Sequence, residues 1–359
     1  MLFVPPPITG DQSGYSQACW NYLMSLHTAG FRDLDLFPNT SIDWRDVPLW
    51  AHAIRSQTNS PKRSPIIMHG DPTTISALRV GGAPRLLLTV FETTKLPKRI
   101  IDDLLAATDG IITASEFNRQ GLVDSGYTKP VHVVPHTEGR WWWENAPART
   151  ITDRFVFTYV GTMNPRKNAL GALAAYKAAF PEESKDTAFV LKTFATNEDQ
   201  IAGLEAASEG RSDIWIWNDL WKESKIQWLH ANTDVFVSAH CGEGWGVGPF
   251  KSKLLGKRVI YTDFSAVREF LTPEFDFPVE CDLIDLPRWS VGESYTVAGQ
   301  GESPLQWAKP RFDALVEAFR TARKIESPPP AEHIKALRDK FEWANVGRQF
   351  IEVIDKYPG

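Results

Sequence analysis

The sequence predicts an α/β protein built from two doubly wound, Rossmann-like domains. Short β-branched and aromatic runs alternate with helical patterns along the chain, as in parallel sheets covered by helices. At 359 residues the chain is long enough to bury two hydrophobic cores. A polar, proline-containing stretch at 144–153 separates two such series. We therefore expect a first domain at 1–150, a second at 151–330 and a C-terminal helix at 331–359, after the break at Ser327-Pro328-Pro329-Pro330.

The first domain opens with a short apolar run at 2–4, which predicts a strand, and with a helical pattern that ends near Gly30. Ser115 can cap a helix that runs to Gly126. The further strands that we expect lie at 34–37, 66–69, 85–91, 111–114 and 131–136.

Polar residues follow two of these strands directly. Asp71 comes after the strand at 66–69, and Glu92 and Thr93 come after the strand at 85–91. Because ligands of open α/β sheets bind at the carboxyl ends of strands, these side chains are candidate binding residues. A carboxylate at Glu92 could accept a proton or a hydrogen bond from a ligand hydroxyl. The alternative is a Glu that caps the next helix or has no chemical role.

No metal site is expected. Asp33-Leu34-Asp35 matches an Asp-x-Asp metal signature, but Leu34 and Leu36 belong to an expected strand and nothing nearby supplies further ligands. The three cysteines are widely spaced and show no metal-ligand pattern. We interpret them as buried thiols of a reducing compartment; they are Cys19, Cys241 and Cys281.

The most informative stretch of the sequence lies in the second domain, at residues 234–263. Residues 234–238 predict a buried strand, which a glycine-rich turn and a helix follow. Glycines let the backbone approach a ligand, and a helix start offers unpaired N–H groups and a positive dipole end, so this order suits a diphosphate. Glu243 in the turn could hold sugar hydroxyls. An ordinary strand-to-helix turn with a surface Glu is the alternative.

A second loop of the same domain carries adjacent cations. Residues 155–161 predict a strand, and the loop that follows contains Arg166 and Lys167 before a helix begins. Lys167 offers a compact charge and Arg166 a planar fork, and both suit phosphate oxygens. Two basic residues in a loop are more often solvated surface. Their place opposite the Glu243 turn favours the phosphate-binding interpretation.

These segments resemble the GT-B glycosyltransferases, in particular the retaining glycosyltransferase family 4, or glycosyl transferases group 1. That family reads E-G-F-G-x-x-x-x-E-A-x-x-x-G-x-P-V-I, and this chain reads E-G-W-G-V-G-P-F-K-S-K-L-L-G-K-R-V-I from Glu243 to Ile260. The family's G-x-x-x-x-R-K-G corresponds to Gly161 to Asn168. The series F-E-T, S-E-F-N, S-G-Y and V-V-P-H, and the later W-A-x-P, resemble one GT-B subgroup. The second Glu of the E-x7-E motif, which usually holds the donor's ribose, falls on Lys251.

The resemblance implies two domains that face each other across a cleft, the first binding the acceptor and the second the nucleotide sugar. The final helix would cross back to the first domain. The implied catalytic residues are Glu92, Glu243 and Lys167. The implied donor-binding residues are Gly10, Gly14, Gly161, Arg166, Lys167, Glu243, Gly244, Trp245, Gly246, Val247 and Lys251. The acceptor-binding candidates are Asp71, Thr93 and Trp141, and for Trp141 packing at a seam between domains is the alternative.

Composition narrows the class of protein. Apolar residues make up 43% and charged residues 23%, which describes a soluble globular chain. The net charge of −5 gives the protein no overall positive field that would attract polyanions. It does not exclude a local basic groove. The N-terminus lacks a signal-peptide pattern and no apolar run approaches a membrane span, so we expect a cytoplasmic protein without a transmembrane segment.

We expect an enzyme that transfers a hexosyl or pentosyl group from a nucleotide-diphosphate sugar to a hydroxyl of a glycan or glycolipid. The family resemblance implies retention of configuration. No cofactor or metal is expected, because backbone N–H groups, Lys167 and Arg166 would stabilise the leaving diphosphate. Two alternatives stay open: a viral-type enzyme that glycosylates hydroxymethylated DNA bases, and a GT-B protein that binds sugar nucleotides without turnover, which Lys251 favours. The oligomeric state is open.

Overall fold

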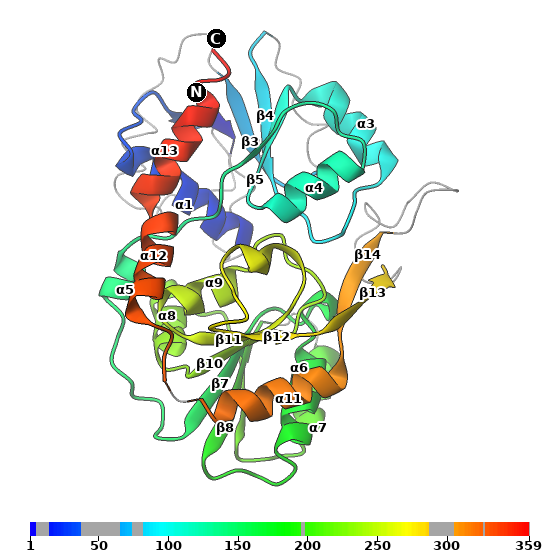
Figure 1. Cartoon of the computed structure of the whole chain (residues 1–359), viewed down its shortest axis with the longest axis vertical. Helices are drawn as coiled ribbons and strands as arrows, with labels where there is room; N and C mark the ends of the chain where they lie inside the picture. The colour runs from blue at the N-terminus through cyan, green and yellow to red at the C-terminus, as the bar shows by residue number, and fades with distance from the viewer. Residues whose placement is uncertain are drawn as a thin grey trace. The chain divides into compact units, whose positions relative to one another are not determined.

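The computed structural model describes residues 1–4, 14–36, 65–73, 82–194, 198–286, 305–325 and 327–358. Contacts within the chain divide it into two compact units (Figure 1). Unit 1 contains the described residues of Met1–Arg140, Val291–Leu305 and Asp339–Gly359, and unit 2 contains those of Trp141–Ser290 and Gln306–Arg338. Each unit has its own parallel sheet and its own hydrophobic core.

In the described part of unit 1, six parallel strands form a sheet in the order β2-β1-β3-β4-β5-β6. Because β2 and β3 lie on opposite sides of β1, the winding direction reverses between β1 and β3, which is the switch point where ligands of such sheets bind. The strands are β1 (Leu2–Val4), β2 (Asp35–Leu36), β3 (Ile66–His69), β4 (Arg85–Thr89), β5 (Gly110–Thr113) and β6 (Val131–Val133).

Helices cover both faces of this sheet. On one face α1 (Gly14–Thr28) and α13 (Trp343–Ile354) share a core with β3 and β4, and Figure 1 shows the two helices side by side. On the other face α3 (Lys98–Ala107) and α4 (Glu116–Asp124) pack on β4 and β5. The helices α1 and α13 approach so closely that a Cβ at Gly347 would overlap a backbone carbonyl oxygen of α1. The C-terminal helix is therefore part of the core of unit 1.

The described part of unit 2 also has six parallel strands, in the order β9-β8-β7-β10-β11-β12. Counted from the first strand of the unit, this order is 3-2-1-4-5-6, which is that of dinucleotide-binding Rossmann sheets. The switch point lies between β7 and β10, which pair directly. The strands are β7 (Phe155–Val160), β8 (Thr187–Thr193), β9 (Ile214–Asn218), β10 (Val235–Ser238), β11 (Arg258–Thr262) and β12 (Phe277–Val279).

Two groups of helices sandwich this second sheet. The first group, α6 (Ala169–Ala179), α7 (Glu198–Ser208) and α11 (Phe312–Arg323), shares one apolar core with β7 and β8. The second group, α8 (Glu223–Ala231) and α9 (Val247–Leu254), lies on the other face. The shorter elements are α5 (Trp141–Glu144), η2 (Pro165–Lys167), η3 (Ser265–Glu269), the antiparallel pair β13 (Cys281–Asp285) and β14 (Gln306–Pro310), and α12 (Ala331–Phe341).

The α/β class and the two doubly wound sheets predicted from the sequence are confirmed, and the element ends differ by a few residues. The strand predicted at 85–91 ends at Thr89, because Phe91 turns into the core under α3 and α4. The strand predicted at 131–136 ends at Val133, shortly before Pro135, which has no N–H to donate. Ser115 caps α4 as predicted, accepting the Asn118 N–H at 3.2 Å.

The cysteine prediction holds in part. All three are free thiols, and Cys19 and Cys241 are buried. Cys281 is only partly buried, because it lies in the β13–β14 ribbon, which has an exposed side. Among the residues that the structure describes, no helix combines the length and apolar character needed to cross a membrane.

Candidate functional site

Two loops meet at the switch point of unit 2. One follows β7 and contains Arg166 and Lys167, and the other follows β10 and contains Glu243. The N–H of Cys241 donates to the Arg166 carbonyl oxygen at 2.7 Å, so the two loops are bonded to each other. Parallel strands deliver both loops to the same edge of the sheet.

The Glu243 carboxylate lies between the two cations. Its Oε1 accepts from Lys167 Nζ at 2.6 Å, and its Oε2 accepts from Arg166 Nη1 at 3.1 Å. Arg166 Nη1 also donates to the Gly242 carbonyl oxygen at 2.6 Å. Glu243 is 5% exposed, so this is a largely desolvated ion-pair network.

The cluster keeps Glu243 ionised. Burial by itself raises the pKa of Glu243, but the charges of Lys167 and Arg166 outweigh burial and lower the pKa to about 2. Burial lowers the pKa of the neighbouring His240, and its Nε2 lies 3.3 Å from the Phe264 carbonyl oxygen. At neutral pH the three groups Glu243, Lys167 and Arg166 therefore carry a net charge of +1, from two cations and one anion.

Unusual backbone geometry holds these loops in place. Ser265 has a φ of 68°, and its Oγ accepts the Glu243 N–H at 2.9 Å. Asn168, directly after Lys167, has a φ of 55°. The Asn164 side chain accepts the Arg166 N–H at 2.9 Å. Such positive φ values are uncommon outside glycine and cost free energy, so the surrounding structure fixes both turns.

The start of α9 follows the Glu243 turn. Gly246 has a φ of 91°, and a Cβ there would lie 2.8 Å from Val267 Cγ1, so this position requires glycine. No described side chain caps α9, and Pro249 in the first turn has no N–H of its own. Gly244 is buried, and Val247 opens the helix. The positive end of the helix dipole thus adds to Lys167 and Arg166, and the place suits an anion.

Two of the predicted donor-binding residues are engaged in packing. Trp245 is buried against the rings of Phe250 and Phe270. Lys251 is 4% exposed, pairs with the Glu223 carboxylate of α8, and lies 4.4 Å over the ring of Trp142. Its charge is therefore balanced inside unit 2.

The acceptor candidates of unit 1 lie at the carboxyl ends of β3 and β4. Asp71 Oδ1 accepts from Thr73 N at 2.8 Å and Oγ1 at 2.7 Å. Thr93 Oγ1 donates to the Lys95 carbonyl oxygen at 2.6 Å. Burial raises the pKa of Tyr15 well above its ordinary value, and the carboxylates of Glu92 and Asp71 raise it further. Tyr15 thus lies near both carboxylates. Sequence reasoning had singled out Glu92 and Asp71 but not Tyr15.

The remaining predicted residues are spread over both units. Gly14 is the first residue of α1 in unit 1, whereas Gly10 lies outside the described residues. Gly161 follows β7, and a Cβ there would lie 2.8 Å from Tyr159 Oη. Trp141 is partly exposed in α5, and its carbonyl oxygen accepts from Gln227 Nε2 at 3.1 Å. Trp141 thereby belongs to unit 2.

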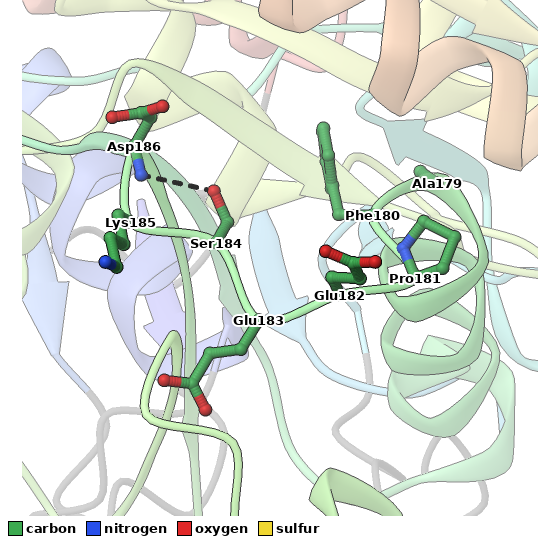
Figure 2. Close-up of a pocket in the computed structure, with 8 residues that line it drawn as sticks. All are labelled: Ala179, Phe180, Pro181, Glu182, Glu183, Ser184, Lys185 and Asp186. Carbon is green, nitrogen blue, oxygen red and sulfur yellow. Dashed lines mark hydrogen bonds between the residues drawn. The ribbon is translucent and has the colours of Figure 1, made fainter.

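Surface hollows also lie at the opposite, amino-terminal edge of the unit 2 sheet. Figure 2 shows one, lined by residues 179–186 between α6 and β8, where the Asp186 N–H donates to Ser184 Oγ at 3.2 Å. Another is lined by Arg149, Asp153, Arg154, Phe155, Lys185, Asp186, Asp234 and Arg323. Both precede strands, so they lie away from the Glu243 cluster. In the described ranges, no group of three or more His, Cys, Asp or Glu side chains could hold a metal ion.

A scan against protein-family models and a search of curated proteins find no match to the sequence. Solved structures with the same fold are glycosyltransferases of the GT-B type, so two Rossmann-like units of that fold are established here.

Three of these structures illustrate the range of similarity. Sucrose-phosphate synthase from Thermosynechococcus elongatus aligns with a TM-score of 0.67 at 12% identity, covering 99% of this chain and 98% of that one. Anabaena HepE, solved with UDP and glucose, aligns with a TM-score of 0.64 at 14% identity, covering 99% of each chain. A mutant of S. aureus TarM, solved with fondaparinux, α-GlcNAc-glycerol and UDP, aligns with a TM-score of 0.59 at 8% identity. The alignment covers 81% of this chain but only 55% of the TarM chain.

Proposed function

We propose that this protein is a glycosyltransferase that moves a sugar from a nucleotide-diphosphate sugar to an acceptor hydroxyl. The observation that carries the proposal is the cluster of Lys167, Arg166 and Glu243 at the switch point of unit 2, beside the start of α9. The GT-B fold supports the reaction class, since solved proteins of this fold include a UDP-forming trehalose-phosphate synthase and a sucrose-phosphate synthase. We assign the donor to unit 2 and the acceptor to unit 1.

The chemistry required of unit 2 is stabilisation of a leaving diphosphate. When the bond between the anomeric carbon and the β-phosphate oxygen breaks, negative charge collects on the phosphate oxygens. Lys167 and Arg166 can donate charge-assisted hydrogen bonds to these oxygens, and the start of α9 adds N–H groups. Glu243 would accept hydrogen bonds from hydroxyls of the transferred sugar. These groups supply the charge stabilisation themselves, so we propose transfer without metal or cofactor.

The acceptor side is proposed on the carboxylates of unit 1. Glu92 and Asp71 both lie near Tyr15 at the carboxyl ends of β4 and β3, a suitable place for hydroxyl groups. Glu92 would accept the proton of the attacking hydroxyl, and Thr93 would line the same site. A glycan or glycolipid is the acceptor that we propose, with retention at the anomeric carbon. Because TarM and HepE were solved with UDP, UDP-sugars are the first donors to test.

A GT-B protein that binds sugar nucleotides without turnover is the second candidate. The observation in its favour is Lys251, which stands where the resembling family has Glu and is balanced by Glu223. An ammonium can donate to ribose hydroxyls but cannot accept their protons as a carboxylate can.

One experiment separates the two candidates. Purified protein is incubated with UDP-, GDP- and ADP-sugars, and both binding and release of the nucleoside diphosphate are measured. An enzyme releases nucleoside diphosphate from at least one donor that it binds, and Glu243→Gln abolishes this release; a melting curve verifies that the variant is folded under the assay conditions. Binding without release, in the presence of glycan acceptors, would support the binding protein. Absence of binding to every nucleotide sugar would refute both.

A further inference from the structure

The cations of the proposed diphosphate site already hold an anion that belongs to the protein. Each oxygen of the Glu243 carboxylate accepts from a different cation, Oε1 from Lys167 at 2.6 Å and Oε2 from Arg166 at 3.1 Å. Two oxygens of a phosphate group would be held in the same way, each by a separate cation. A carboxylate and a phosphate group cannot both occupy this position.

We propose that Glu243 is an internal anion that occupies Lys167 and Arg166 in the free protein, and that a bound diphosphate displaces it. The inference rests on the proposed function, because it takes these cations to be the diphosphate site. It adds a competition between the protein's own carboxylate and the ligand.

The geometry explains why this carboxylate stays in place until a ligand arrives. Glu243 is 5% exposed, and a buried carboxylate without partners is costly. The backbone of the turn is held as well, since Glu243 N–H donates to Ser265 Oγ and Glu243 O accepts from Ala266 N at 3.3 Å. In the proposed displacement the side chain moves, while these two hydrogen bonds hold the main chain.

The charges decide which anions can displace it. Glu243 contributes one negative charge, whereas a diphosphate contributes two or three and can also accept from the start of α9. The neighbouring His240 is buried, which lowers its pKa, and its Nε2 already contacts the Phe264 carbonyl oxygen at 3.3 Å. The carboxylate needs new hydrogen-bond donors, which the hydroxyls of a sugar attached to the diphosphate would supply. Competition by Glu243 thus favours ligands that carry both a diphosphate and a sugar.

Inorganic pyrophosphate tests this inference without knowledge of the donor. Calorimetric titration at pH 7.5 compares the unaltered protein with Glu243→Gln, which keeps the shape of the side chain and removes its charge. We expect Glu243→Gln to bind pyrophosphate about tenfold more tightly or better. Glu182→Gln removes the same charge at the exposed amino-terminal edge of unit 2, and we expect its affinity to equal that of the unaltered protein.

Lys167→Met in the same titration separates the inference from the proposed function. If Lys167→Met weakens binding and Glu243→Gln leaves it unchanged or weaker, the internal anion is refuted and the diphosphate site stands. If neither change alters the affinity for pyrophosphate, the proposed diphosphate site is itself refuted. If Glu243→Gln does not fold, Glu243→Asp takes its place, because a shorter carboxylate cannot reach both cations. Tighter binding by Glu243→Asp then supports the inference, and unchanged or weaker binding overturns it.

Discussion

At the scale of single residues, the proposed donor site depends most on Lys167. We predict that Lys167→Ala weakens binding of a nucleoside diphosphate at least tenfold, because a charge-assisted hydrogen bond of about 1.5–3 kcal/mol is lost. The same change removes one of the two cations that balance the negative charge of Glu243, and its carboxylate then repels the phosphates. Binding of the free nucleoside should not change.

Calorimetry with UDP and uridine, and with the GDP and ADP pairs, measures this difference. Lys185→Ala is the matched control, because Lys185 is an exposed cation of the same unit at the amino-terminal edge of the sheet. Equal losses for diphosphate and nucleoside would mean that Lys167 acts through the fold and not through a phosphate contact.

Sequence reasoning found the residues of the unit 2 cluster but not their contacts. Arg166 and Lys167 were expected opposite the Glu243 turn, and the structure joins them to its carboxylate. The ion pair between Lys251 and Glu223 was not foreseen, because the two residues belong to different helices and local patterns do not report such pairs. The positive φ of Ser265 was also missed, since serine gives no signal for a left-handed backbone.

At the scale of elements, the packing of α1 on α13 depends on Gly347. A Cβ at this position would overlap the Ser25 carbonyl oxygen, and backbone cannot move aside as a flexible side chain can. We predict that Gly347→Ala lowers the free energy of unfolding by about 1–3 kcal/mol. Urea denaturation followed by circular dichroism measures the effect.

Gly203→Ala in α7 is the matched helical control. A Cβ there meets nothing within 4 Å, so alanine should stabilise the helix by about 0.5–1 kcal/mol. If both substitutions shift stability in the same direction, helix propensity and not close packing determines the result at Gly347.

The contact between α8 and α9 depends on the pair Lys251 and Glu223. We predict that Lys251→Glu lowers the free energy of unfolding by about 1–3 kcal/mol, because it sets two carboxylates together where one is buried and the other is partly exposed. The contact of Lys251 with the Trp142 ring is lost as well. The double change Lys251→Glu with Glu223→Lys restores opposite charges and should recover part of the loss.

The double variant also tests the role of position 251 in donor choice. The family resemblance places this position near the donor ribose, and a carboxylate there accepts hydroxyl protons whereas an ammonium does not. We therefore expect the ranking of nucleotide sugars in competition binding to differ between the double variant and the unaltered protein. An identical ranking would place Lys251 outside the donor pocket.

At the scale of the whole molecule, the α/β class was predictable and the order of the strands was not. Alternation of strand and helix patterns is local, so it survives in the sequence, and strands such as Ile66–His69 were located without error. Strand order depends on pairings between distant segments. Nothing local shows that β1 lies between β2 and β3, or that β7 pairs with both β8 and β10. Those pairings create the two switch points, so the structure shows why the loops predicted to lie opposite each other, with Lys167 and with Glu243, meet at one edge of the unit 2 sheet.

The molecule should also lose stability on mild acidification, because several histidines are buried in neutral form. Burial lowers the pKa of His69, His136 and His230 to about 3. In the unfolded chain these side chains take up protons near pH 6.5. Between these two values the unfolded state binds protons that the folded state excludes, so stability is present above about pH 6.5 and falls as the pH falls toward 3. Each such histidine contributes a slope of about 1.4 kcal/mol per pH unit.

Urea denaturation at steps between pH 7 and pH 5 measures this slope, in a window that lies above the range where most carboxylates titrate. His136→Asn isolates one contributor, because an amide can replace the 2.9 Å contact of His136 Nδ1 with Tyr22 Oη and does not take up a proton. We expect the slope to decrease by about the contribution of one histidine. His27→Asn, at a partly exposed position of α1, should change the slope far less. If the unaltered protein and His136→Asn lose stability equally between pH 7 and pH 5, His136 is protonated in the folded state, and its neutral burial is refuted.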